Sequence, residues 1–357
     1  MTKIVDIEDI RKKREKKEIG IPIENINKKE LKRRGHEIGD ILGCDEKGEE
    51  ICVRKGKGNL YVDGNMEKEQ LFDFMRSQIY QNIQRGDSMV IVDLGSRIYK
   101  RELWIYLTIH GYRVDSYNMD CMTESDCFNC LDGLGAENEE QIVMIANDII
   151  DDQKYKFMTY PVETVCKALL SAVLLASLTE MEESDRNMLE IATIFRLGVS
   201  GTMLDKILHV MFEELDETSS AKQLFAMYSE AEEGIRMEAI QKIGNALAVY
   251  EKRANGSLCD NFRTNRYDME MPVKEKSVLF IESGQLPEDK VLFSVFMERL
   301  YDSMLKKAEE RQQDVTVMLL DYPYYGGLCG LEKYMEEGPE KGICTTLYED
   351  DRKLDGS

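Results

Sequence analysis

The sequence lacks several features that whole classes of protein need. Its longest strongly apolar run, residues 168–178, is shorter than the roughly 18–20 residues that cross a bilayer. Residues 1–17 are charged from the third position onward, which is not the pattern of a secretory signal. The histidines are too scattered to suggest a catalytic pairing with serine or cysteine: His36, His110 and His209. We therefore expect a soluble, cytoplasmic protein, which only its partners could hold at the inner face of a membrane.

Cysteine is present at a level that suits a reducing compartment. Nine cysteines in 357 residues do not fit a disulfide scaffold. Three of them cluster as Cys121, Cys127 and Cys130, but this cluster holds a single C-x-x-C pair, whereas structural zinc usually takes four ligands. We expect structural thiols and no metal site, with zinc binding as the alternative.

Positive charge is scarce in all but the first part of the chain. The formal net charge is −21. Residues 1–34 hold 12 Lys and Arg against 7 Asp and Glu, so this segment carries +5 and the remainder −26. Affinity for nucleic acid comes largely from basic side chains that release counterions, so direct DNA binding by the acidic body is disfavoured. The basic run at 11–17 is either the solvated start of a helix or a contact for phosphate or anionic lipid.

Short apolar runs alternate with helical patterns in the first and last thirds of the chain. The expected strands are 60–63, 88–94, 112–119, 277–283, 315–321 and 342–348. The expected helices between them are 67–84, 98–110 and 287–313. This alternation predicts an α/β fold with a mainly parallel sheet and right-handed crossovers. Before the first of these strands, residues 29–59 hold two glycine-bounded apolar stretches that predict a small antiparallel β element.

The middle of the chain has a different character, since helical patterns follow one another without a strand. The expected helices are 137–151, 160–180, 184–197, 201–216 and 219–252, with Ser184 and Ser219 as N-caps and Gly198 as a stop. A helical block inserted into an α/β sheet explains the change. We divide the chain into a charged lead with a small β element (1–58), two halves of the α/β domain (59–136 and 253–357, the latter with an acidic tail), and an inserted all-α subdomain (137–252).

Methionine is abundant, with 20 residues in the chain. Several follow the faces of expected helices: Met203, Met211, Met227 and Met237. We expect them to fill the core rather than to form an adaptable binding surface.

An ordered set of segments resembles one family. NLYVDGNMEKEQLFDF (59–74) is placed as a strand, a turn and a helix, where an α/β ATPase has its phosphate loop. SMVIVDLGSRIYK (88–100) and VTVMLLDYPYYGGLCGLEKYMEE (315–337) follow in the order of later family blocks. Together they resemble the TraG/TraD-type coupling proteins of type IV secretion, the ATPases that feed DNA–protein substrates into conjugation. This resemblance implies a RecA-like P-loop NTPase fold with an inserted all-α subdomain.

The residues that hold phosphate in that family are missing here. A phosphate loop reads G-x-x-x-x-G-K-S/T, because glycines let backbone N–H groups surround the phosphates, lysine meets their oxygens and a hydroxyl holds Mg²⁺. Matching the pattern from Gly64 places Glu69 at the second glycine, Gln70 at the lysine and Leu71 at the hydroxyl. Each change removes a different contribution to nucleotide binding.

The second half of the implied site is altered as well. Asp321 matches the Walker B aspartate, but Tyr322 stands where the family has the glutamate that activates water. The family's DPKGE turn keeps only its aspartate, as Asp93, and its arginine-bearing segment matches residues 337–342, which contain no arginine. We therefore expect a pseudo-ATPase with no catalytic residue, no nucleotide cofactor and no metal.

The resemblance leaves three functions open. The first is an inactive adaptor or scaffold, encoded with a conjugative or integrative mobile element, whose partners are a relaxase, another substrate or the active coupling protein. The second is a residual nucleotide-binding or ATPase subunit that completes its site with a neighbour in a ring. The third is a folded remnant with no selected activity. Homo- and hetero-oligomers are both compatible with the resemblance.

Overall fold

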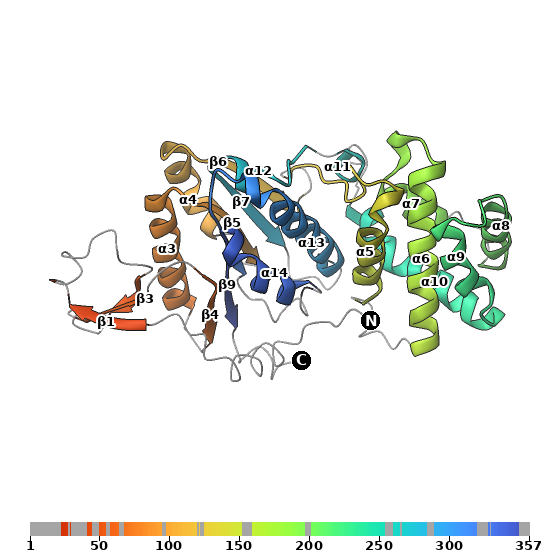
Figure 1. Ribbon diagram of the computed structural model, residues 1–357, viewed down its shortest axis with the longest axis horizontal. Helices are drawn as coiled ribbons and strands as arrows, with labels where there is room; N and C mark the ends of the chain where they lie inside the picture. The colour runs from red at the N-terminus through yellow and green to blue at the C-terminus, as the bar shows by residue number, and fades with distance from the viewer. Residues whose placement is uncertain are drawn as a thin grey trace. The chain divides into compact units, whose positions relative to one another are not determined.

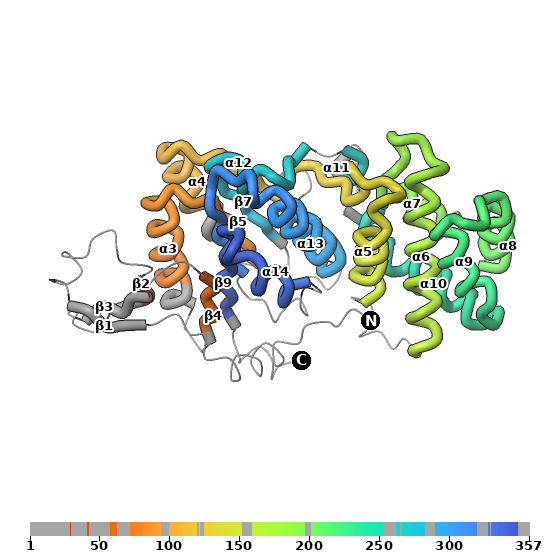
Figure 2. Tube along the Cα trace, viewed as in Figure 1, coloured from red at the N-terminus to blue at the C-terminus, as the bar shows by residue number. Residues whose placement is uncertain are grey.

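The computed structural model of the chain describes residues 23–27, 29, 41–44, 50–54, 58–63, 68–94, 98–119, 121, 125–151, 159–196, 201–253, 260–264, 266–283, 289–319, 328 and 330–349. Two compact units contain them. The sheet unit comprises Met1–Ser116, Met269–Gln285 and Leu300–Ser357, and the helical unit comprises Tyr117–Asp268 and Leu286–Arg299. Figure 2 traces the chain through both units.

A six-stranded sheet forms the core of the sheet unit. Its strands, in spatial order, are β4 (Leu60–Asp63), β9 (Ile343–Glu349), β8 (Val315–Leu319), β5 (Ser88–Leu94), β7 (Ser277–Ser283) and β6 (Arg113–Asn118). Every pairing whose register is described is parallel, including the central pair in which Ile91 is opposite Phe280. The middle strands are apolar on both faces, as in β5, where Met89–Val92 are all buried, and this is typical of a sheet covered on both sides. The expected α/β class is therefore confirmed.

Helices cover the two faces of the sheet. On one face, α3 (Lys68–Arg85) and α4 (Ile98–Ile109) pack side chains such as Ile79 and Leu107 against Ile91 and Phe280 in a continuous apolar cluster. On the other face lie α14 (Leu331–Glu337) and the end of α13 (Asp289–Lys307). The Tyr301 and Tyr334 rings of these two helices stack 4.5 Å apart. Figure 1 shows α3 and α14 on opposite sides of the strands. This layering is what right-handed crossovers produce when the strand order reverses direction.

The helical unit is built from consecutive helices. They are α5 (Glu139–Asp151), α6 (Tyr160–Glu180), α7 (Met188–Arg196), α8 (Gly201–Glu213), α9 (Ser220–Ser229), α10 (Glu233–Arg253) and α11 (Asp260–Arg263). Helix α6 is its centre, since 13 of its residues are buried. Among the described residues, α6 is also the one helix long and apolar enough to cross a membrane, but 72% of that stretch is buried inside the protein. Its apolar composition is therefore explained by its place in a helical core.

Smaller elements complete the chain. A three-stranded antiparallel sheet contains β1 (Ile23–Asn27), β3 (Glu50–Arg54) and β2 (Ile41–Cys44), in that order. The short helix α12 (Met271–Lys274) precedes β7. Among the described residues, four 3-10 turns flank helices: Ala136–Asn138, Glu183–Asp185, Ala308–Glu310 and Pro339–Lys341. The small antiparallel element expected within 29–59 is confirmed, but its first strand, β1, lies before that range.

Two expectations about the helical block are wrong in detail. The single helix expected at 219–252 is two helices, α9 and α10, separated at residues 230–232. Ser184 is not the N-cap of α7, because it lies in a 3-10 turn and Asn187 does the capping: its Oδ1 accepts hydrogen bonds from the N–H groups of Leu189 at 3.1 Å and Glu190 at 3.0 Å. Ser219 is at the N-cap of α9, as expected. The expected stop at Gly198 lies outside the described residues.

The methionine expectation is also wrong for three residues. Met203 is 51% exposed, Met211 is 46% exposed and Met227 is 49% exposed. The remaining one, Met237, is half-buried, and its sulfur accepts a long hydrogen bond from the Thr202 hydroxyl at 3.9 Å. Apolar periodicity therefore placed these residues on helices correctly but did not distinguish the face that packs from the face that meets solvent.

Candidate functional site

Parallel sheets bind ligands outside the carboxyl ends of their strands, where the strand order reverses. In the sheet unit this edge lies beyond the ends of β4, β5, β7, β8 and β9. Of the residues expected there, Gly64, Asp321 and Tyr322 lie outside the described residues. The structure therefore gives the frame of the candidate site, but not the loops themselves.

The described elements lie on either side of the expected phosphate-loop position. Strand β4 ends at Asp63 and α3 begins at Lys68, so the chain passes from strand to helix in the position of a phosphate loop. Glu69, Gln70 and Leu71 consequently lie in the first turn of α3. The N–H groups of a first helical turn have no partner within the helix, and this end of a helix attracts anions.

Away from β4, the carboxyl edge holds a buried ion pair. Lys100, in the first turn of α4, donates from Nζ to Glu282 Oε2 of β7 at 2.7 Å. Lys100 Nζ also donates to Ser116 Oγ of β6 at 2.9 Å, and this hydroxyl donates to the same Glu282 oxygen at 2.9 Å. Glu282 is only 3% exposed, so its charge needs these partners. The arrangement ties α4 to the ends of two strands.

A second buried carboxylate lies on the neighbouring strand. Asp93 of β5 is opposite Glu282 in the parallel register and is 2% exposed. Residues opposite each other in parallel strands point to the same face, so both carboxylates face the side that α4 covers. The Lys100 ammonium is already held by Glu282 and Ser116. This part of the edge is thus organised by internal ion pairing and hydrogen bonding.

The opposite edge of the sheet has a small polar cavity. Its lining includes Asn82 and Arg85 of α3 and Thr316 of β8, and its volume is about 20 Å³. Thr316 Oγ1 donates to Asn82 Oδ1 at 2.9 Å, and Arg85 donates to the same oxygen at 2.7 Å. A volume of this size accommodates a single water molecule rather than a cofactor.

The cysteine cluster has the character of structural thiols. Cys127 and Cys130 are buried, and Cys121 is half-buried. Burial raises the pKa of the Cys130 thiol to about 12, which keeps it protonated and unreactive near neutral pH. Within the described part of the chain, no group of three or more His, Cys, Asp or Glu is arranged to hold a metal ion.

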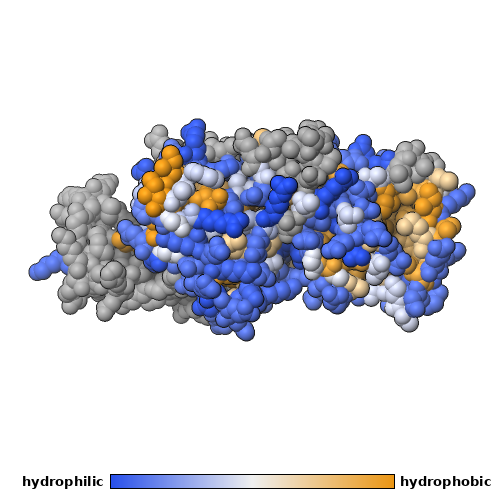
Figure 3. Space-filling model, turned by 90° about the horizontal axis from the view of Figure 1, so that it is seen from above, coloured by the Kyte–Doolittle hydropathy of each residue, from blue (hydrophilic) through white to orange (hydrophobic). Residues whose placement is uncertain are grey.

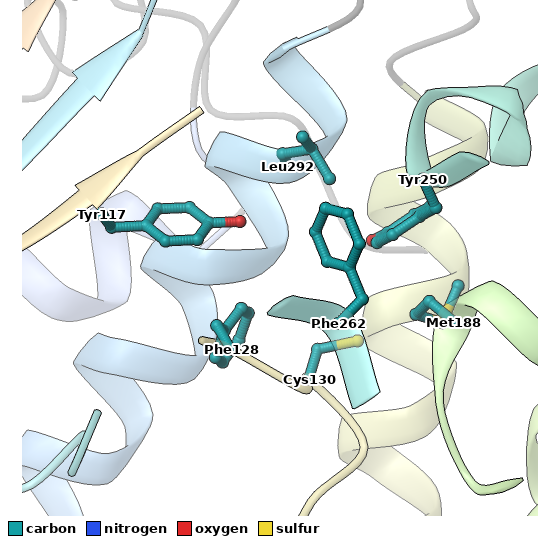
Figure 4. A pocket seen from close by; sticks show the side chains of 7 residues that line it. All are labelled: Tyr117, Phe128, Cys130, Met188, Tyr250, Phe262 and Leu292. Carbon is teal, nitrogen blue, oxygen red and sulfur yellow. The ribbon is translucent and has the colours of Figure 1, made fainter. Parts of the chain in front are cut away.

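Cys130 also borders an aromatic cluster in the helical unit, shown in Figure 4. Side chains from several segments converge there, including Tyr117, Phe128, Tyr250 and Phe262. The Tyr250 and Phe262 rings meet edge to face, 5.2 Å between centroids. The hollow between these side chains has no room for a water molecule. It is packed core, and we do not assign it a ligand.

Solved structures share the fold of this chain. The unbound monoclinic form of the bacterial conjugative coupling protein TrwBdeltaN70 is 15% identical in sequence, with a TM-score of 0.59 over 92% of this chain and 72% of that one. The plasmid coupling protein TrwB, in complex with the non-hydrolysable ATP analogue ADPNP, has the same identity and TM-score over 92% of this chain and 74% of the other. This chain has the fold of a conjugative coupling protein.

Other comparisons show that the sequence similarity is low. TrwB in complex with ADP and Mg²⁺ matches at 13% identity, with a TM-score of 0.55 over 92% of this chain and 74% of the other. No protein-family model and no curated protein matches the chain. The coupling-protein fold is therefore retained at a sequence identity that says nothing by itself about retained chemistry.

The sequence alone did not reveal the Lys100–Glu282 pair. The two residues are 182 positions apart. Glu282 ends the apolar run of β7, and Lys100 lies in the first turn of α4. A charged residue at the end of a buried strand was the only available signal, and it did not name a partner.

Proposed function

We propose that this chain is a catalytically inactive, coupling-protein-like component of a conjugative or type IV secretion system, acting as an adaptor or scaffold. The observation that carries the proposal is a coupling-protein fold in which the helix after β4 begins with Lys68-Glu69-Gln70-Leu71. In a working phosphate loop, glycine, lysine and a hydroxyl residue occupy the last three of these positions.

The chemistry of those side chains argues against nucleotide binding. Glutamine at position 70 offers an amide in place of a full positive charge, and leucine at position 71 cannot ligate Mg²⁺. The partial positive charge of a helix N-terminus would favour phosphate, but the sequence has acidic residues at positions 67 and 69. Two like charges 4 Å apart repel by about 4 kcal/mol at an effective dielectric constant of about 20.

The retained architecture supports a role other than catalysis. The central strands are buried on both faces, and Glu282 at the carboxyl edge is satisfied by Lys100 and Ser116. Most substitutions in a packed core destabilise it, so an intact core suggests that selection still acts on the fold. An adaptor needs the fold and its surfaces, whereas it does not need the phosphate loop.

The test of the inactive state is a turnover assay on the purified full chain with ATP and Mg²⁺. We expect no phosphate release above a buffer control. The matched variant Gln70→Ala should behave identically, because glutamine has no catalytic task here. Magnesium-dependent turnover that Gln70→Ala abolishes would contradict the proposal.

The adaptor role needs a separate test. Affinity purification of the tagged chain from cells carrying its native genetic element should recover a relaxase, another transfer substrate or an active coupling protein. Recovery of none of these, from cells in which transfer proceeds, would remove the adaptor role.

One observation favours a second candidate, a nucleotide-binding subunit that works in a ring with shared sites. Similar solved structures of TrwB carry ADPNP, GDPNP, or ADP with Mg²⁺. Tight equilibrium binding of ATP by this chain, alone or mixed with an active coupling protein, would favour this candidate over the adaptor.

A further inference from the structure

Helix α8 has two apolar faces, and only one of them is buried. Leu204, Leu208 and Phe212 pack into the helical unit. Met203 and Val210 are 51% and 59% exposed, although both are large apolar residues. A surface helix normally turns its apolar residues to the core and its polar residues to solvent, so the exposure of Met203 and Val210 is unusual.

The exposed residues form one stripe. Because each helical residue turns about 100°, Met203, Ile207, Val210 and Met211 fall within an arc of about 100° on α8. Ile207 is half-buried and the other three are exposed. Figure 3 shows hydrophobic side chains gathered at the surface of the helical unit among hydrophilic ones.

The stripe borders a hollow between α6, α7 and α8. Its apolar lining includes Val173, Ile194, Leu208, Met211, Phe212 and Leu215, and its volume is about 50 Å³. Met211 belongs to both the stripe and the hollow, so the two form one continuous surface, which we call the α8 groove. Space of this size fits the end of a single leucine- or methionine-sized side chain as an anchor.

The rim of the α8 groove is acidic. Glu180 lines the hollow. Further exposed carboxylates lie within four residues of the lining residues Met181 and Leu215 in the chain: Glu182, Glu183, Asp185, Glu213, Glu214, Asp216 and Glu217. The cations in these segments include Lys206, which is exposed on α8, Arg186, whose Nε donates to Met181 O at 2.9 Å, and Lys222, whose Nζ pairs with Glu217 at 2.8 Å. They are fewer than the carboxylates. An apolar segment with negative charge would be repelled here, and one with positive charge attracted.

We propose that the α8 groove docks a short amphipathic helix of a protein partner, whose apolar face carries the anchor and whose flanks carry Lys or Arg. Exposed methionines suit this mode, because their flexible side chains adapt to an apolar helix face. This groove would specify which kind of partner the proposed adaptor binds, and the inference therefore rests on the proposed function.

The experiment measures binding of a labelled model peptide to the full chain by fluorescence anisotropy. The probe is an amphipathic helix of leucine and lysine, about 18 residues or five turns long. Its controls are a scrambled peptide of identical composition and a leucine–glutamate peptide of the same pattern. We expect saturable binding of the first peptide alone, weakened by added salt.

Two variants locate the site. Met211→Lys places a positive charge in the groove, which repels the lysines of the peptide, and we expect it to weaken binding about tenfold or more. Met227→Lys changes the net charge equally at a methionine of similar exposure that is outside the hollow, so binding should stay within about twofold. The far-ultraviolet circular dichroism of each variant verifies the fold.

Several results would overturn the inference. One is binding of the scrambled or glutamate peptide as tight as that of the leucine–lysine peptide. Another is an equal loss of binding in the two variants. A third is a dimer of this chain, seen by sedimentation, that Met211→Lys dissociates, because a second copy would then cover the groove. Deletion of residues 1–20 that raised peptide affinity would show that the chain's own basic segment occupies the groove, which also contradicts a partner helix. If the peptide binds as predicted but no transfer component is recovered from cells, the groove stands and the adaptor role fails. If a transfer component is recovered from cells but the peptide does not bind, only the assignment of the groove fails.

Discussion

The two units differ in where they expose unusual chemistry. In the sheet unit, the first turn of α3 holds the acidic, amide and apolar residues Glu69, Gln70 and Leu71, while a continuous apolar cluster surrounds Phe280. In the helical unit, the core around α6 is equally well packed, but α8 presents an exposed apolar stripe beside a hollow. Under the proposed function, the sheet unit serves as architecture and the helical unit offers a docking surface.

Exposed apolar residues in the sheet unit qualify that contrast. Trp104, Ile105 and Ile109 of α4 are also exposed, at 41%, 70% and 75%. The hydrophobic surface near α4 is visible in Figure 3. The α8 groove differs in that its exposed methionine Met211 also lines a hollow, and we assign no partner to the α4 residues.

The largest expected effect tests whether the sheet core is still held to native packing. Phe280→Ala removes a fully buried ring, and we expect it to lower the free energy of unfolding by about 3–5 kcal/mol. Urea unfolding followed by the fluorescence of Trp104, the single tryptophan, reports the transition. The control is Ile109→Ala, which should cost less than about 0.5 kcal/mol because the side chain is 75% exposed. Similar costs for both would mean that the sheet core is not specifically packed.

The next effect concerns the buried ion pair. Lys100→Met leaves the Glu282 carboxylate buried without its cation, and we expect a loss of about 3 kcal/mol in unfolding free energy. The double variant Lys100→Met with Glu282→Leu should recover most of this loss, because no buried charge is left. Arg76→Met removes an exposed pair with Asp73 and should cost less than about 1 kcal/mol. A Lys100→Met protein as stable as the wild type would show that the pair does not hold the edge together.

A smaller effect, in the helical unit, depends on pH. Asp205 of α8 is 8% exposed, and it accepts hydrogen bonds from Tyr228 Oη at 2.6 Å and Arg236 Nε at 3.1 Å. Burial alone would raise the pKa of Asp205, but these bonds outweigh burial and hold the pKa below its ordinary value. A depressed folded-state pKa contributes stability that is complete above the unfolded pKa of about 3.9 and is lost as the pH falls through the folded pKa.

The variant Asp205→Asn tests this assignment. We expect it to cost about 1–3 kcal/mol at neutral pH and to flatten the loss of stability below about pH 4. Glu217→Gln, whose side chain is 88% exposed, should change neither property. Chemical denaturation at a series of pH values measures both, and an unchanged acid limb in Asp205→Asn would contradict the role of this carboxylate.

The smallest effect distinguishes the observed cap of α7 from the expected one. Asn187→Ala removes the acceptor for two N–H groups at the start of the helix and should cost about 1 kcal/mol. Ser184→Ala should cost a few tenths of a kcal/mol at most, since Ser184 is exposed and is not at the cap. Equal losses of stability would return Ser184 to consideration.

Features set by local sequence patterns could be predicted, whereas features set by contacts between distant segments could not. Strands such as 88–94 and 277–283 could be predicted because each is a dense apolar run bounded by polar or turn residues. The break between α9 and α10 could not, because Glu230, Ala231 and Glu232 are all compatible with a helix and only tertiary packing separates the two helices. The Lys100–Glu282 contact and the exposure of Met211 depend on which faces meet in three dimensions, and that information is non-local.

For the candidate site, the flanking strand and helix could be predicted from the sequence. Its strand–turn–helix frame is local and was placed within a residue or two, but the residues expected to bear on nucleotide chemistry, Gly64, Asp321 and Tyr322, lie outside the described residues. The assignment of Glu69, Gln70 and Leu71 to the first turn of α3 therefore carries the proposal on its own.

Equilibrium binding of ATP with Mg²⁺, measured by titration calorimetry on the full chain, tests the central claim most directly. We predict no saturable heat for the wild type, and a measurable affinity only after Glu69→Gly, Gln70→Lys and Leu71→Thr are combined to restore a phosphate loop. Saturable binding of ATP by the wild type, abolished by substitutions in the first turn of α3, would contradict the claim that this unit has lost its nucleotide chemistry.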